Sequence, residues 1–159
     1  MHGFTYRHAS TSLKLAITGF LVLTVVGLGV ATLQIYVRTG LTARGALTHY
    51  RGDEATLQYP KSFNEMVEIT HAHAFTMPLL AFVLSLGFMP SSAPEWLKRF
   101  VVAALFAGVA LELGVPWLAR YGPAWTVHLL AVAGVLLSAG LLTAVAVPFY
   151  EMWLAPKKG

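Results

Sequence analysis

The chain has 159 residues, of which 57% are hydrophobic and only 11% are charged, and its mean hydropathy is +0.66. A soluble domain carries about a quarter charged residues and cannot bury so much apolar surface at this length, so the composition excludes an ordinary soluble enzyme. Cysteine is absent, which excludes disulfides, iron–sulfur clusters and covalently attached c-type haem. The Lys and Arg residues are scattered near the ends of apolar runs, so we expect no nucleic-acid partner.

Four apolar runs are each long enough to cross a lipid bilayer, which takes about 20 helical residues. They predict membrane spans over about residues 13–37, 64–89, 95–119 and 124–153. The first run could instead belong to a signal peptide, but its apolar stretch exceeds the usual hydrophobic region of about 7–15 residues. We therefore predict an all-α integral membrane protein, a four-helix bundle forming a single transmembrane domain over residues 1–159.

A polar loop, residues 38–63, separates the first two spans and is typical of a surface loop or a short helix lying on the membrane. An even number of spans places both termini on one side of the membrane and this loop on the other. Six Lys and Arg residues fall on the terminal side and five on the loop side. The positive-inside rule therefore favours, by a narrow margin, a multi-pass protein of the inner (cytoplasmic) membrane with cytoplasmic termini.

Polar residues inside the spans are few, and ionisable groups in a membrane are usually functional. The second span carries His71 and His73, the third carries Glu112 and the fourth carries His128. At a rise of about 1.5 Å per residue, His71 and His128 lie about 8–10 Å into their helices, and Glu112 lies about 12 Å from the loop-side end of its own. We expect one polar layer, near the loop side, built from three helices.

Helical phase distinguishes the two histidines of the second span, because residues at i, i+3, i+4 and i+7 share a face. His71 shares its face with polar Asn64 and Glu68, whereas His73 shares its face with apolar Met66 and Ile69. The more polar face is expected to point into the bundle, which favours His71 as the inward histidine. A haem would accept the apolar neighbours of His73 equally well, so both remain candidates for cofactor binding.

Two histidines from separate helices, at one depth and without cysteine, suit axial ligation of a b-type haem. His71 and His128 are the predicted iron ligands, and His73 is the other cofactor-binding candidate. In this layout the chain resembles the small four-helix membrane-anchor cytochrome b subunits of bacterial respiratory complexes, through its four spans, its His71-Ala72-His73 segment and its His128. The resemblance implies haem held by paired histidines and electron exchange with quinone. This chain departs from many such anchors in having ligands for at most one haem.

Other interpretations fit the same residues. The spacing Glu68-x-x-His71 recurs in di-iron carboxylate bundles, but a second such motif is missing, so Glu112 and His128 could complete only a mononuclear metal site. Small residues such as Gly108, beneath Glu112, either allow close helix packing or leave a slot for a flat macrocycle. A histidine in a membrane can also serve simply as a hydrogen bond between helices.

The leading hypothesis is a membrane electron-transfer subunit that binds one b-type haem, a quinone, or both within a respiratory complex. Its protein partners would include a redox partner on the side of loop 38–63, and it would be at most a quinone-reactive subunit of an oxidoreductase. Glu112 is the predicted catalytic group, a general base for the proton released from quinol; alternatively it bonds His128 or Gln34 as a packing residue. The alternative function is a non-redox accessory or assembly subunit of a larger membrane complex.

Overall fold

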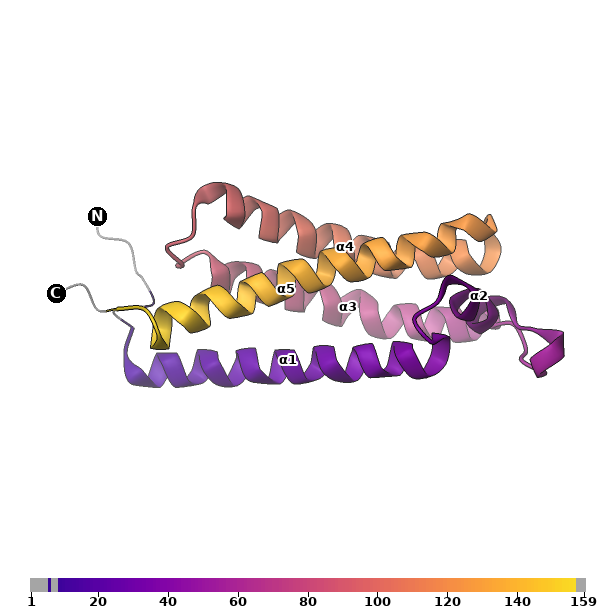
Figure 1. Cartoon of the computed structure of the whole chain (residues 1–159), viewed down its shortest axis with the longest axis horizontal. Helices are drawn as coiled ribbons and strands as arrows, with labels where there is room; N and C mark the ends of the chain where they lie inside the picture. The colour runs from indigo at the N-terminus through magenta and orange to yellow at the C-terminus, as the bar shows by residue number, and fades with distance from the viewer. Residues whose placement is uncertain (1–5, 7–8, 157–159) are drawn as a thin grey trace.

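A computed structural model describes residue 6 and residues 9–156 of the chain, and its long helices lie side by side (Figure 1). The long helices are α1 (Thr11–Thr39), α3 (Phe63–Phe88), α4 (Glu95–Tyr121) and α5 (Leu129–Trp153). The short 3-10 helix η3 (Ala124–His128) leads directly into α5. Four segments of the described chain are long and apolar enough to span a membrane: α1, α3, α4 and η3 joined to α5. The prediction of an all-α membrane helical bundle is confirmed.

The helix boundaries follow from local signals in the sequence. Ser10 precedes α1 and its hydroxyl accepts a hydrogen bond from the amide of Leu13 at 3.4 Å. Gly40 ends α1 in the left-handed conformation, with φ of 59°, which glycine adopts without steric cost. Pro148 lies inside α5, and the helix continues beyond it to its last residue. The start of α1 and the end of α5 lie at one end of the bundle, and residues 40–62 lie at the other (Figure 1).

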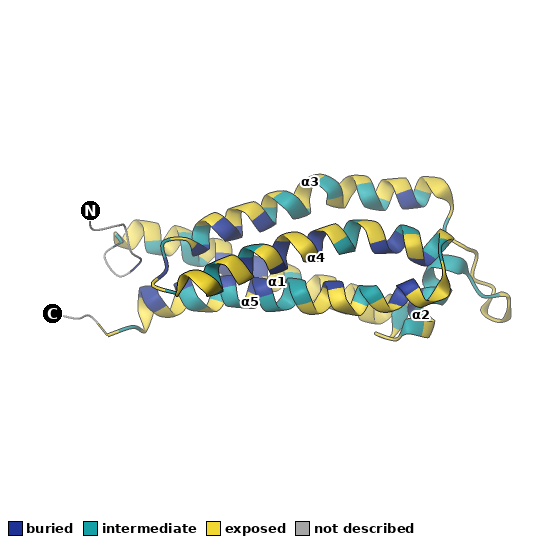
Figure 2. Cartoon of the chain, turned by 90° about the horizontal axis from the view of Figure 1, so that it is seen from above, coloured by how far each residue is buried: buried dark blue, intermediate teal, exposed yellow. Residues whose placement is uncertain are grey.

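Helices α4 and α5 form the tightest contact in the bundle. A Cβ atom added to Gly108 would lie 2.6 Å from Cγ of Leu137, and one added to Gly140 would lie 3.0 Å from Cγ of Leu105. Glycine at these two positions therefore lets the helices approach more closely than any side chain would allow. Helix α3 completes the core, and the buried residues concentrate where these three helices meet (Figure 2).

Helix α1 lies at the edge of the bundle and is almost entirely exposed. Only 6% of its apolar window is buried, against 39% for α4. Its polar contacts to α5 are at the terminal side, where the Lys14 ammonium donates to the carbonyl of Met152 at 3.0 Å and the Trp153 indole donates to Thr18 at 2.9 Å. An apolar cleft of about 280 Å³ separates α1 from α3 and α5 in this half of the bundle.

A buried carboxylate joins α5 to the loop between α3 and α4. Oε1 of Glu151 accepts hydrogen bonds from the backbone amide of Ser92 at 2.7 Å and from its hydroxyl at 2.6 Å. Glu151 is only 5% exposed, and its Oε2 has no hydrogen-bond partner among the described residues. The Tyr6 hydroxyl donates to the carbonyl of Gly87 at the same end. These bonds fix the terminal-side end of the bundle.

Candidate functional site

The loop between α1 and α3 folds over the loop-side end of the bundle. It forms the short helix α2 (Ala43–Arg51) and the 3-10 turn η2 (Glu54–Thr56). The Arg51 guanidinium donates to the carbonyl of Ala119 at 2.7 Å and to the carbonyl of Gly122 at 2.5 Å. Because the last carbonyls of a helix have no partner within it, Arg51 satisfies the end of α4 and holds α2 above the bundle.

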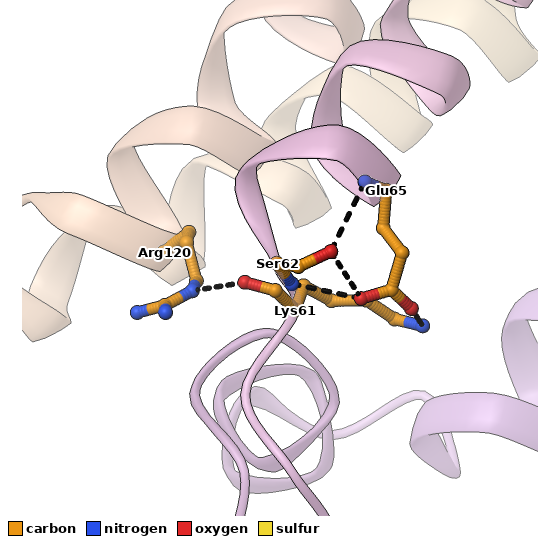
Figure 3. Close-up of polar contacts among 4 residues, drawn as sticks. All are labelled: Lys61, Ser62, Glu65 and Arg120. Atoms are coloured by element: carbon orange, nitrogen blue, oxygen red, sulfur yellow. Dashed lines mark hydrogen bonds and ion pairs between the residues drawn. The ribbon is translucent and has the colours of Figure 1, made fainter.

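A second set of bonds fixes the start of α3 beside the end of α4, as Figure 3 shows. Ser62 and Glu65 form a capping box, in which the Glu65 carboxylate accepts from the Ser62 amide at 2.8 Å. Lys61 pairs with the same carboxylate at 2.8 Å, and its carbonyl accepts from Arg120 at 2.7 Å. The entry into α3 is therefore rigidly placed, and with it the polar residues that follow.

The next turn of α3 is bonded directly to α4. The Trp117 indole donates to the Thr70 hydroxyl at 2.8 Å, and that hydroxyl donates to the carbonyl of Met66 at 2.8 Å. Trp117 also lies edge-on to Phe63, with ring centroids 5.6 Å apart. This contact sets the relative height of the two helices immediately above the candidate site.

A small polar cavity lies between α2, α3 and α4. Its volume is about 40 Å³, and its lining consists of Tyr50, Ile69, Thr70, His73, Glu112, Leu113 and Pro116. The half-buried Glu112 side chain interacts electrostatically with His73 and with Tyr50. A water molecule needs about 10–15 Å³ and two or more polar partners, so the cavity has the volume and the polar groups for a few water molecules.

His73 has a defined tautomer in this site. Its Nδ1 lies 2.7 Å from the carbonyl oxygen of Ile69. A carbonyl oxygen only accepts, so Nδ1 carries the proton and the neutral ring presents a free lone pair at Nε2. Histidines that ligate metals are commonly oriented by such a bond from the other ring nitrogen. His73 is therefore prepared to accept a proton, a hydrogen bond or a metal ion through Nε2.

Tyr50 brings a hydroxyl to the cavity from α2. Burial raises the pKa of Tyr50 to about 12, the negative charge of Glu112 acts in the same direction, and Arg38 opposes them. Tyr50 therefore keeps its proton and acts as a hydrogen-bond donor. Its neighbour His49 lies edge-on to it, with ring centroids 5.0 Å apart. Burial, with Lys61 and Arg38 adding to it, lowers the pKa of His49, so this imidazole is neutral at pH 7.

A family model for a transmembrane helical domain matches residues 40–159, about three quarters of the chain. The chain belongs to the Aq_1264_TM family of transmembrane helical domains. The family domain begins one residue after the end of α1 and includes α2, α3, α4 and α5. Every residue that lines the polar cavity lies within it. No curated protein and no solved structure matches the chain.

The family domain brings together only two of the four residues expected to form the polar layer. Glu112 and His73 line the same cavity. His71, His73 and His128 are all exposed, and of the three only His73 lines the cavity. Among the described residues no group of three or more His, Cys, Asp or Glu side chains could hold a metal ion. Whether these histidines bind haem stays a prediction.

The assignment of His71 as the inward histidine is wrong, and the reason lies in how α3 packs. Its buried and half-buried face contains Met66, Ile69 and Leu84, the residues that share a phase with His73. His71 is exposed, and its ring contacts Phe75 one turn along the same helix, with centroids 5.6 Å apart. Apolar packing against α4 and α5, and not the burial of polar residues, sets which face of α3 points into the bundle.

Several residues of the site were not expected from the sequence. Tyr50 and Arg51 reach the site from the polar loop, and Trp117 bonds Thr70 across two helices. These contacts join residues distant in sequence, so no local pattern marks them. The spacing Ser62-x-x-Glu65 is a capping-box signal that could have located the start of α3.

Proposed function

We propose that this chain is a membrane electron-transfer subunit that reacts with quinone at its loop side, within a respiratory complex. One observation carries the proposal: Glu112, a carboxyl inside a membrane span, shares a cavity with His73 and with a tyrosine that keeps its proton. A carboxyl, an imidazole and a phenol together can accept and relay protons. Ionisable groups inside a membrane span mark functional sites by default, which supports this role for Glu112.

Oxidation of a quinol to a quinone releases two protons and two electrons. The cavity of about 40 Å³ is too small for a quinone ring, so the ring would bind at its mouth. Glu112 would take one hydroxyl proton as general base, directly or through a water molecule in the cavity, and the other proton would leave through the water of the cavity to the loop side. A b-type haem, where bound, would supply the acceptor for the two electrons, and a redox partner at the loop side would take them onward.

The histidines fit a haem by their chemistry, since imidazole nitrogen is an axial ligand of b-type haem. His128 and one histidine of α3 would hold it, and the haem would supply a one-electron carrier beside the quinol. The close approach of Gly108 to Leu137 means that the small residues of α4 serve helix packing rather than a slot for the macrocycle. His128 is exposed, so a haem bound through it would need a partner subunit to cover it.

The test is the substitution Glu112→Gln, which preserves shape and hydrogen bonding but removes proton exchange. Quinol oxidation by the purified protein with its redox partner should fall by about 100-fold, the lower end of the range for general acid–base catalysis. The level of folded protein and any haem spectrum should not change. Glu95→Gln, at the exposed terminal-side end of the same helix, is the matched control. Equal turnover of Glu112→Gln and parent protein across pH 5–9 would show the proton-acceptor role to be wrong.

A second candidate, a non-redox accessory subunit, is favoured by the exposure of α1. Gly27 and Ala31, one turn apart on this helix, are both exposed, and pairs of small residues at this spacing are common where membrane helices associate. Colourless protein after expression with ample haem, together with no quinol turnover, would favour this candidate. Reduced-minus-oxidised bands of a b-type haem that disappear in His128→Ala would favour the redox subunit.

A further inference from the structure

The outward side of α3 carries a polar strip that the bundle does not cover. Asn64, Glu68, His71, Phe75 and Phe82 share one helical face, and all five are exposed. We call these five residues the α3 outer face. Phe75 is 72% exposed and Phe82 is 51% exposed. The polar part of this face lies towards the loop side, and the aromatic part continues it towards the middle of the membrane.

Contact with lipid is energetically unfavourable for the polar part of the α3 outer face. Counted from Phe63 at about 1.5 Å per residue, Glu68 lies about 8 Å and His71 about 12 Å along α3. Within the described chain neither side chain has a hydrogen bond or ion pair to another side chain. Ionisable groups at membrane depth normally face protein or water and pair with one another. A polar partner surface next to this strip would give both side chains hydrogen-bond partners.

We propose that the partner is a second copy of this chain, packed α3 against α3 about a two-fold axis along the membrane normal. The face is self-complementary: a carboxylate and an imidazole lie three residues apart on one side of a helix. In a two-fold contact the same patch meets itself, so residue i contacts residue j and the reverse. Glu68 of each copy then bonds His71 of the other, giving two reciprocal pairs, and the two phenylalanines form an apolar seam beyond them.

The dimer is independent of the proposed quinone chemistry. His73, which lines the cavity with Glu112, lies two residues and about 200° around the helix from His71. The dimer contact therefore leaves the cavity open and leaves His73 as the α3 candidate for a haem ligand. Failure of one proposal does not decide the other, because the first is measured by quinol turnover and the second by association of the chain.

The chain has no cysteine, so a single introduced thiol reports contact without further changes. Phe75→Cys in the full chain, oxidised in native membranes, should give a disulfide-linked dimer. Val135→Cys is the control, because Val135 is 68% exposed on α5 and lies at a similar depth, about 18 Å from the loop-side end. If Phe75→Cys does not accumulate, Phe82→Cys tests the same face.

The reciprocal pairs are tested in the Phe75→Cys background. Glu68→Ala and His71→Ala should each weaken association by about tenfold, since two pairs are lost at a factor of about three each. The exchange variant Glu68→His with His71→Glu keeps both groups on the face and should restore the dimer. The proposal is overturned if Phe75→Cys cross-links no more than Val135→Cys, if it cross-links to a different protein instead, or if the single substitutions leave the dimer unchanged.

Discussion

The seam between α4 and α5 and the surface of α1 show two ways in which apolar helices behave in one membrane protein. At the seam, a Cβ added to Gly108 would lie 2.6 Å from Leu137. On α1, a Cβ added to Gly27 would meet no atom within 4 Å. Hydropathy does not distinguish the two, since both helices have a high mean value, 2.2 for α1 and 2.0 for α4. The difference is in packing, and it coincides with the boundary of the family domain at residue 40.

The largest expected effect on the free energy of unfolding is at the close contact between α4 and α5. Gly108→Leu should destabilise the bundle by more than about 3 kcal/mol, because the new side chain overlaps Leu137 and the backbone must move. Gly108→Ala should cost about 1–3 kcal/mol for the same reason. The measurement is reversible unfolding of the purified protein in mixed detergent with SDS.

Gly27→Ala is the matched control on the exposed helix. It should leave the free energy of unfolding unchanged or raise it by up to about 1 kcal/mol, since alanine favours helix over glycine and nothing opposes the added methyl group. Equal losses from Gly27→Ala and Gly108→Ala would mean that the two helices are packed alike, which would remove the contrast.

A second prediction concerns how the loop helix is held to the tight region. Arg51→Gln removes the charged hydrogen bonds to the carbonyls of Ala119 and Gly122. We expect a loss of about 1.5–3 kcal/mol, the usual contribution of hydrogen bonds to charged groups, in the same unfolding experiment. Arg44→Gln, an exposed arginine on the same short helix, should change little. If both substitutions cost the same, the contact of α2 with the end of α4 contributes nothing specific.

The smallest expected effect is a pH dependence of stability caused by His49, on the short helix that follows α1. Burial lowers the pKa of His49 in the folded state, and Lys61 and Arg38 contribute in the same direction. The unfolded state then binds more protons, so stability rises with pH. The contribution is complete above the ordinary histidine value of 6.5 and is lost as pH falls through the lowered pKa. Unfolding between pH 5 and pH 8 should show this slope, and His49→Gln should remove it.

Arg38 lies in the last turn of α1, so it tests whether the edge helix is coupled to the family domain. Arg38→Gln should reduce the slope without abolishing it, because burial is the larger cause of the lowered pKa. An unchanged slope would place the end of α1 outside the electrostatic reach of α2. That result would mean that α1 and the family domain are not electrostatically coupled at this point.

The fold was largely predictable because lipid imposes simple rules on a chain. Four apolar runs of sufficient length gave the four spanning segments, and the structure has four such segments in its described part. The site was only partly predictable. Depth along a helix follows from residue number, so Glu112 and a histidine of α3 were correctly placed in one layer. Which face of α3 points into the bundle depends on its packing against neighbouring helices, so the sequence did not identify which of His71 and His73 would line the cavity.

The hydrogen bonds of Arg51 and Arg120 show why the other contacts around the candidate site could not be predicted. Each guanidinium donates to carbonyls of a segment that is 59 or more residues away in the sequence. Any arginine near a span end can snorkel to water or bind lipid phosphate, and its own sequence neighbours do not tell these outcomes apart. Only the assembled bundle determines which carbonyls lie within reach.

The carboxylate of Glu151 has a consequence for the order in which the protein can be completed during synthesis. Its partners, the amide and hydroxyl of Ser92, lie 59 residues earlier in the chain. The ribosome therefore releases the loop between α3 and α4 long before it makes the group that fixes that loop. Until α5 has been made and inserted, the loop between α3 and α4 lacks these two hydrogen bonds. A nascent chain stalled before residue 151 would therefore lack the carboxylate that holds this loop against α5.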